Sequence, residues 1–261
     1  MLVWMSLAAR LAPLLLMTSA FLVATRWLHD RLSQRNRIAG AAAAILVLIA
    51  GLFIIIPYAA RMGLIVGIRY AVKDHAWPVV SQRVDLYERW GGTLEGNLLF
   101  ARGMARANEH RLPDAFTDFA AAAQSDDPLV SRTDAVLEEG LCLYAMHDED
   151  RAKGMLLSLP DSFHGAAERD YILGRIAEHH GEPAETWFRK SLAADSSFGP
   201  ALYRLLRILS QRHDVGQALA AVAEFRRANP AEANAPYLNA MLSAIQRGEV
   251  LVDYEPFRLD A

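Results

Sequence analysis

The sequence predicts an all-α protein in which a hairpin of two transmembrane helices precedes a series of paired helices. Residues 38–60 form a run of 23 positions without a charged side chain, long enough for a membrane span. From Leu94 onward, apolar residues recur with helical spacing and without the alternation of a strand. A glycine also recurs inside successive apolar runs, at Gly103, Gly140 and Gly174, so the second part of the chain is predicted to be a helical repeat.

Composition divides the 261-residue chain into a basic head and an acidic body. Residues 1–75 hold eight basic and two acidic side chains, whereas the remainder holds 19 basic and 28 acidic ones. This asymmetry is typical of a membrane anchor joined to a soluble domain, and the acidic body argues against a nucleic-acid partner. The single cysteine, Cys142, excludes an intrachain disulfide framework and any metal site built from cysteines alone.

Two apolar segments are expected to cross the membrane, at about residues 4–25 and at 38–60. In the first, Leu11–Thr25 is uncharged. A cleaved signal peptide is the alternative, but no basic region precedes this segment and no clear cleavage site follows it. The Ala/Gly-rich start of the second segment is suited to close packing on a partner helix.

The loop between the two segments carries four arginines, which predicts that the loop is cytoplasmic. The acidic body is then expected on the extracytoplasmic (periplasmic) side of an inner, or plasma, membrane that the chain crosses more than once. Residues 61–90 are interpreted as a juxtamembrane helix that lies at the lipid surface or extends the span. A solvated helix packed on the soluble domain is the alternative. Within this segment the helical pattern covers residues 62–77, and we expect Pro78 to end that helix. We expect the lipid bilayer to contact residues 1–75.

The repeat also contains a series of alanines in the second helix of each pair. Three of them follow the three glycines by 12, 12 and 10 residues: Ala115, Ala152 and Ala184. A fourth, Ala218, lies 34 residues after Ala184 and has no glycine before it in this series. Four residues after three of them lies a larger apolar side chain: Phe119, Phe188 and Val222. A small residue on each helix allows two helices to cross closely, and the larger one fills the adjacent groove.

This pattern resembles the tetratricopeptide repeat (TPR), most clearly at residues 171–197 with Leu173-Gly174, Ala184 and Phe188. The resemblance covers about residues 96–230. It implies a TPR-like α-solenoid of about four repeats over residues 91–248, with Ala231–Gln246 as a capping helix and an irregular tail at 249–261. One departure is Asp170, which stands where the family has a large apolar residue.

No nucleotide-binding, nucleophile or zinc-protease motif is present in the sequence, so neither an enzyme nor a cofactor is predicted. His179 and His180 are the best metal candidates. Adjacent residues on a helix point about 100° apart, so we do not expect them to share one metal ion. Cys142 lies in an apolar run and is expected to be buried packing.

In TPR proteins the first helices of the repeats line a concave groove. Carried over in register, the resemblance implies a partner-binding groove formed by Phe100, Met104, Leu137, Leu141, Tyr144, Tyr171, Arg175, Tyr203 and Arg207. Each Tyr/Arg pair is spaced i, i+4, so the two pairs are expected to lie side by side as interface anchors. A solvated face with local salt bridges is the alternative interpretation.

The sequence therefore favours a non-enzymatic, membrane-anchored scaffold that binds protein partners. Its layout is similar to that of bacterial TPR proteins of cytochrome c maturation and of exopolysaccharide secretion. One alternative is an integral subunit of a larger membrane complex that makes its main contact through the Ala/Gly-rich span. An enzyme with its site between repeats is less favoured, because no catalytic motif supports it.

Overall fold

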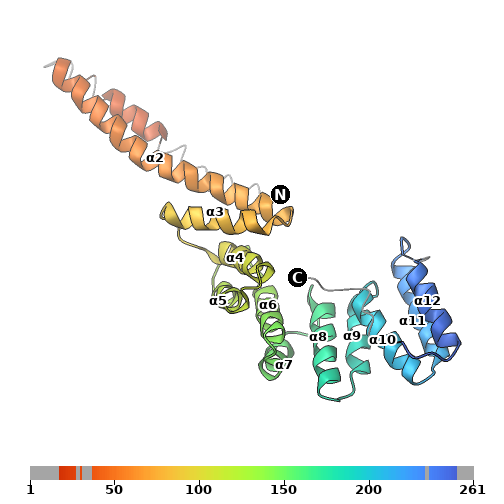
Figure 1. Cartoon of the computed structure of the whole chain (residues 1–261). Helices are drawn as coiled ribbons and strands as arrows, with labels where there is room; N and C mark the ends of the chain where they lie inside the picture. Colours follow the sequence, from red (N-terminus) through yellow and green to blue (C-terminus); the bar gives the residue numbers. More distant parts are fainter. Residues whose placement is uncertain (1–17, 28–29, 31–36, 233–234, 252–261) are drawn as a thin grey trace. The chain divides into compact units, whose positions relative to one another are not determined.

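The computed structural model describes residues 18–27, 30, 37–232 and 235–251, and every regular element in those residues is a helix (Figure 1). The prediction of an all-α chain is confirmed for this part. The chain divides into two compact units, Met1–Leu94 and Glu95–Ala261.

The first unit is built on one long helix, α2 (Arg37–Lys73). This helix contains the predicted span and continues past Ala60 without a break, so residues 61–73 continue the same helix. Most of the first predicted span, at about 4–25, lies outside the described residues, but residues 18–27 are helical. The ring of Phe21 lies so close to Gly51 of α2 that an added Cβ would approach it to 2.4 Å.

Helix α3 (Trp77–Arg89) folds back along the later part of α2 (Figure 1). Its buried side chains include Val80 and Val84, and α2 buries Ile65 and Ile68 in the same stretch. The prediction that Pro78 ends a helix is wrong, because Pro78 lies in the first turn of α3. Proline suits that position since the first turn leaves its N–H groups without helical acceptors.

The second unit is a series of helices in which each packs against the next (Figure 1). In order they are α4 (Gly96–Asn108), α5 (Leu112–Ala123), α6 (Arg132–Ala145), α7 (Glu149–Leu157), α8 (Ala166–His179), α9 (Glu185–Ala194), α10 (Gly199–Gln211), α11 (Val215–Ala228) and α12 (Pro236–Gln246). Helix α12 ends where the predicted capping helix ends but begins five residues later. Residues 233–234 and the tail from residue 252 lie outside the described residues.

The predicted close crossings at the glycines are confirmed. A Cβ added to Gly103 would come within 2.7 Å of the Phe119 ring, and one added to Gly174 within 2.6 Å of the Phe188 ring. At Gly140 the corresponding neighbour is Leu156, at 2.6 Å. These larger side chains are fully buried, so each glycine provides the space that its partner helix fills. Ala184 differs slightly from the prediction, because it lies just before α9 rather than inside it.

A recurring turn joins the two helices of each pair. The chain adopts a positive φ at His75, His110, His147, Gly181 and His213, which follow α2, α4, α6, α8 and α10. In each turn the next residue's N–H donates to a carbonyl five residues back, as from Asp148 to Leu143 at 2.9 Å. This is the Schellman arrangement, which usually uses glycine because a side chain disfavours positive φ.

The α2–α3 hairpin shares this turn with the second unit. Its His75 precedes His110 by 35 residues, close to the spacing of the later turns. Gly67 also faces Arg83, 16 residues ahead, which is the separation between Gly103 and Phe119. The end of the long helix and α3 therefore repeat the local construction of the helix pairs that follow in the sequence.

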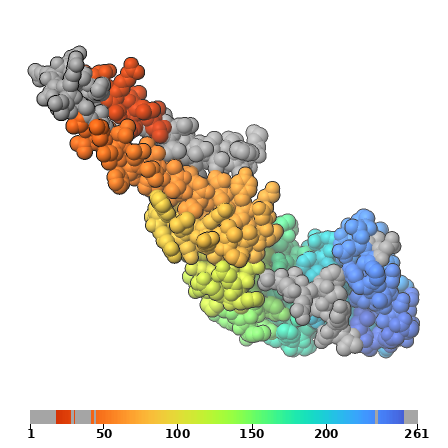
Figure 2. Space-filling model, turned by 45° about the horizontal axis from the view of Figure 1, so that its top comes forward, coloured from red at the N-terminus to blue at the C-terminus, as the bar shows by residue number. Residues whose placement is uncertain are grey.

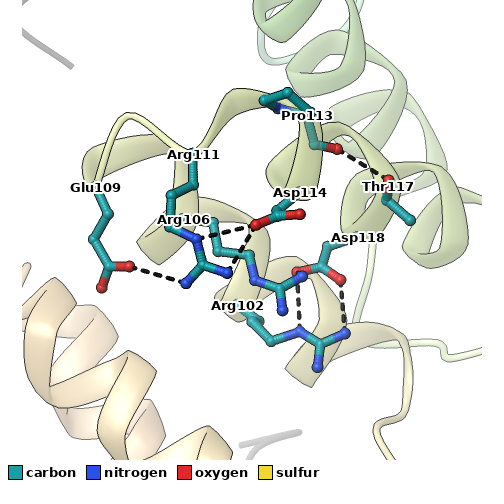
Figure 3. Close-up of polar contacts among 8 residues, drawn as sticks. All are labelled: Arg102, Arg106, Glu109, Arg111, Pro113, Asp114, Thr117 and Asp118. Atoms are coloured by element: carbon teal, nitrogen blue, oxygen red, sulfur yellow. Dashed lines mark hydrogen bonds and ion pairs between the residues drawn. The ribbon is translucent and has the colours of Figure 1, made fainter.

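A charged cluster joins α4 to α5 (Figure 3). The buried carboxylate of Asp118 accepts from Arg102 and Arg106, with N–O distances of 2.7 Å in both ion pairs. Arg111 at the connecting turn pairs with Glu109 and Asp114. The ion pairs of Asp118 with Arg102 and Arg106 thus connect α5 to α4 through a buried carboxylate.

Candidate functional site

The structure places the predicted groove residues on the first helices of the pairs, α4, α6, α8 and α10. Phe100 and Leu137 line one pocket in the second unit. Arg175 and Arg207 meet at a separate cluster of charges. Four of the predicted residues thus belong to two local sites, one lined by carboxylates and one formed by arginines.

The first site, here called the acidic pocket, has a volume of about 380 Å³. Four carboxylates and three phenylalanine rings dominate its lining: Asp134, Glu138, Glu168, Asp195, Phe100, Phe163 and Phe198. Asp134 and Glu168 lie in the first turns of α6 and α8, where a negative charge interacts favourably with the helix dipole. Carboxylates beside aromatic rings suit a cationic group.

Glu138 is the most perturbed carboxyl group of the acidic pocket. Burial raises the pKa of Glu138 to about 7, and the neighbouring charges of Glu168 and Asp134 raise it further in the same direction. Burial also raises the pKa of Glu168. A cation entering the pocket would offset this repulsion and favour the ionised form of Glu138. Sequence reasoning missed all four carboxylates, because they belong to two helices and a loop that only the fold brings together.

The second site, here called the arginine cluster, consists of Arg175, Glu178, Arg204 and Arg207 on α8 and α10. The carboxylate of Glu178 lies 3.1 Å from Arg207, 3.5 Å from Arg204 and 3.7 Å from Arg175. These four side chains carry a formal charge of +2. Arg204 is almost completely buried, while Arg175 and Arg207 each keep 19 % of their side-chain surface exposed.

The predicted proximity of Arg175 and Arg207 is confirmed by their shared carboxylate. Arg204 was missed, although it lies three residues before Arg207 and therefore on the same face of α10. The two tyrosines differ from expectation, because Tyr171 and Tyr203 are only 1 % and 3 % exposed. They do not project as surface anchors.

Tyr171 takes part in the packing between helices. Its ring lies 6.0 Å from that of Phe188 and 5.6 Å from that of Phe198. Its hydroxyl accepts a hydrogen bond from Arg175 at 3.1 Å. Tyr171 and Arg175 therefore contact each other on α8, as their i, i+4 spacing predicts, but the tyrosine is buried and holds the arginine in place.

The remaining predicted groove residues are partly or largely buried. Met104 packs against Ala115, Phe119 and Cys142, and Leu137 is buried. Leu141 and Tyr144 pack against the largest buried apolar cluster, and Tyr144 stacks on His179 at 6.4 Å. A binding role for these residues stays a prediction.

The residues considered for chemistry have structural surroundings. Cys142 is buried, as expected, and burial raises the pKa of its thiol to about 12. His179 and His180 both reach Glu149, with N–O distances of 2.7 and 3.2 Å. Each of the two carboxylate oxygens of Glu149 thus meets one of the two rings. Among the described residues, no group of three or more His, Cys, Asp or Glu side chains could hold a metal ion.

No protein-family model matches this sequence, and no curated protein matches it either. Its function is therefore inferred from the helix packing and from the two sites.

Proposed function

We propose that this protein is a membrane-anchored scaffold whose helix pairs form a TPR-like solenoid that binds protein partners. One observation carries the proposal: a single helix, α2, holds an apolar stretch whose large side chains are mostly exposed and then forms a hairpin built like the pairs that follow. The proposed anchor therefore runs directly into a hairpin of this construction.

Helix α2 supplies the evidence for the membrane anchor. In the described part of the chain it is the one helix long and apolar enough to cross a membrane, with a mean hydropathy of 2.2 over its best window. Its large side chains from Ile45 to Ile56 are mostly exposed (orange in Figure 2). Beyond them, α3 covers α2 and brings charged residues with it. The lipid-covered stretch should therefore end between Pro57 and Arg61.

Two side chains support this boundary. Trp90, just after α3, lines an apolar groove with Phe53, Ile56 and Pro57 of α2. Arg61 donates a hydrogen bond to the carbonyl of Gly91 at 3.1 Å. Tryptophan and arginine are characteristic of the boundary between hydrocarbon and water. The contact between Phe21 and Gly51 supports a second spanning helix beside α2.

The solenoid is supported by the recurring turn and by the glycine crossings. Within the second unit the series comprises four pairs, α4–α5 to α10–α11, and α12 would cap it. We further propose that the array lies on the extracytoplasmic side of a bacterial inner membrane, because the loop before α2 is rich in arginine. A reporter fused after Ala261 that is active only outside the cytoplasm tests this orientation.

The acidic pocket is the best-formed contact point for a partner. Its carboxylates and rings would accept a lysine or arginine side chain from another protein, with the phenylalanines covering the aliphatic part. An entering cation would also relieve the repulsion that raises the pKa of Glu138. We therefore propose that partners are bound through a basic side chain inserted between α6 and α8.

Photocrosslinking in native membranes tests this function. A photoreactive amino acid replaces Phe163 at the pocket, and crosslinked proteins are identified by mass spectrometry. Glu138→Gln with Glu168→Gln should reduce the crosslink to a discrete partner at least fivefold, whereas Asp114→Asn with Glu224→Gln should leave it unchanged. No discrete crosslink, or equal yields from both pairs, would contradict pocket-mediated binding.

An exchange of the anchor separates the scaffold from an integral subunit. If residues 1–60 are replaced by an unrelated hairpin of two spans, a scaffold keeps its partner. A subunit that assembles through its Ala/Gly-rich span loses its neighbours in co-purification. Loss after the exchange would assign the main contact to the membrane helices.

A further inference from the structure

An exposed apolar groove in the first unit follows helix α2. It has a volume of about 390 Å³ and is here called the α2 groove. Its lining is apolar and consists of Ile49, Leu52, Phe53, Ile56, Pro57 and Trp90. From Ile49 to Pro57 it extends along α2 for about 12 Å, at about 1.5 Å per residue. The groove therefore lies in the stretch that the proposed anchor places in lipid.

One end of the α2 groove carries a positive charge. Arg61 lies one turn beyond Pro57 on α2, and its Nε donates to the carbonyl of Pro57 at 3.4 Å. A terminal N–H of Arg61 also donates to the carbonyl of Gly91 at 3.1 Å. Because Gly91 directly follows Trp90, the guanidinium of Arg61 and the ring of Trp90 lie at the same end of the groove.

These contacts do not balance the charge of Arg61. Both acceptors are neutral carbonyls, and no carboxylate in the described part of the chain pairs with this side chain. A guanidinium has five N–H donors in a planar fork, which suits the oxygens of a phosphate. Trp90 is exposed, and its indole N–H suits a polar group at the same level. This end of the groove thus favours an anion.

A phospholipid has both of the chemistries that the groove requires. One acyl chain would fill the apolar lining, while the phosphate would reach Arg61 at the end of the groove. An apolar helix of another protein would cover the same lining but would bring no charge to Arg61. Residues 1–75 hold eight basic and two acidic side chains, and this surplus favours an anionic headgroup over a zwitterionic one.

We propose that the α2 groove binds an acyl chain of an anionic phospholipid whose phosphate pairs with Arg61 beside Trp90. The lipid then connects α2 to the turn that follows α3. This inference rests on the proposed membrane anchor and adds to it the class of lipid that the anchor retains.

Fluorescence quenching by brominated lipids tests the site in the full-length chain. Four of the five tryptophans are replaced by phenylalanine, so that Trp90 alone reports. The chain is placed in bilayers that mix phosphatidylcholine with phosphatidylglycerol, and one of the two lipids is brominated at a time. Quenching then gives the relative binding constant of the two lipids beside Trp90. It should favour phosphatidylglycerol about fivefold, the preference expected from one basic residue near an anionic lipid.

The change that should abolish this preference is Arg61→Gln, because it removes the charge at the end of the groove. The matched control is Arg69→Gln, which removes the same charge about 12 Å further along α2 and should leave the preference unchanged. Circular dichroism and carbonate extraction verify that each variant is folded and integrated in the membrane.

Equal quenching by the two lipids would overturn the proposal but leave the membrane anchor in place. A preference that survives Arg61→Gln would also overturn it, because the general charge of the first unit would then account for the effect. If neither lipid quenches Trp90 in an integrated chain, a protein helix covers the groove and the lipid site is wrong. Release of the unaltered chain by carbonate would instead contradict the anchor itself, and the lipid site with it.

Discussion

Helices α2 and α10 are both rich in large aliphatic residues, but their surroundings differ completely. In α2, Ile45 and Phe53 are 57 % and 77 % exposed, whereas Leu205 and Leu206 of α10 are at most 1 % exposed. Helix α10 also carries Arg204 and Arg207, while 38–60 has no charge. Apolar content alone does not say what covers a helix. The spacing of charges does, and it points to protein around α10 and lipid around α2.

Charges placed on α2 should have the largest effect on this contrast. In a chain that begins at residue 37, Ile49→Arg with Phe53→Arg should cost about 5–7 kcal/mol of membrane insertion, at about 2.5–3.5 kcal/mol for each arginine. The variant should then appear in the carbonate-soluble fraction.

The control for this experiment is Leu157→Arg with Leu219→Arg, two exposed positions of the second unit. That variant should remain with the membrane. If the α2 variant also stays integrated, lipid does not cover the stretch from Ile45 to Ile56.

Removal of a buried ring should have the next largest effect. Phe188 is fully buried against Gly174, so Phe188→Ala should lower the free energy of unfolding of the second unit by about 3–5 kcal/mol. Phe53→Ala removes a phenylalanine ring from the exposed face of α2 and should leave the thermal unfolding of the first unit, to which α2 belongs, unchanged. Equal losses in the two variants would erase the contrast between the two helices.

A smaller and pH-dependent effect is expected from Glu138. Its pKa is raised from 4.5 to about 7 in the folded chain, so folding favours the protonated form. Stability from this group is fully present below about pH 4.5 and is lost as the pH rises through 7. Glu138→Gln should therefore stabilise the second unit by about 1–2 kcal/mol at pH 8 and by nothing at pH 4.5, as measured by urea unfolding.

A constant gain at both pH values would show that Glu138 does not titrate in the acidic pocket. In that case a basic side chain of a partner would gain no pH-dependent attraction from Glu138 when it enters the acidic pocket. The pH dependence of unfolding therefore contrasts Glu138, an ionisable group in the second unit, with residues 38–60 of α2, which carry no charge.

Much of the fold could be predicted from the sequence because small residues mark where helices cross and the absence of charges marks the long apolar helix. Gly103, Gly140 and Gly174 identified the crossings, and the uncharged run identified α2. The hairpin of α2 and α3 was not recognised as a member of the series, because its glycine faces Arg83 instead of an apolar side chain. The recurring histidines at 75, 110, 147 and 213 were the signal that could have revealed it.

The sites were less predictable than the helices. Tyr171 and Tyr203 have the spacing of exposed anchors, but spacing places a residue on a face without saying what lies against that face. The acidic pocket gathers side chains from α4, α6, α8 and the loop before α10. Such a pocket depends on the packing of distant segments, which no local pattern in the sequence records.

For the proposed membrane anchor, the length of α2 has a mechanical consequence. Its 37 residues span about 55 Å, of which about 30 Å suffices for the hydrocarbon core. In that anchor the remainder would be a rigid strut braced by α3, with no flexible linker between the lipid and the first hairpin. A molecule held by that hairpin is confined to a fixed height above the bilayer. It cannot sample the wide volume that a flexible tether would allow, so only targets at that height are within reach.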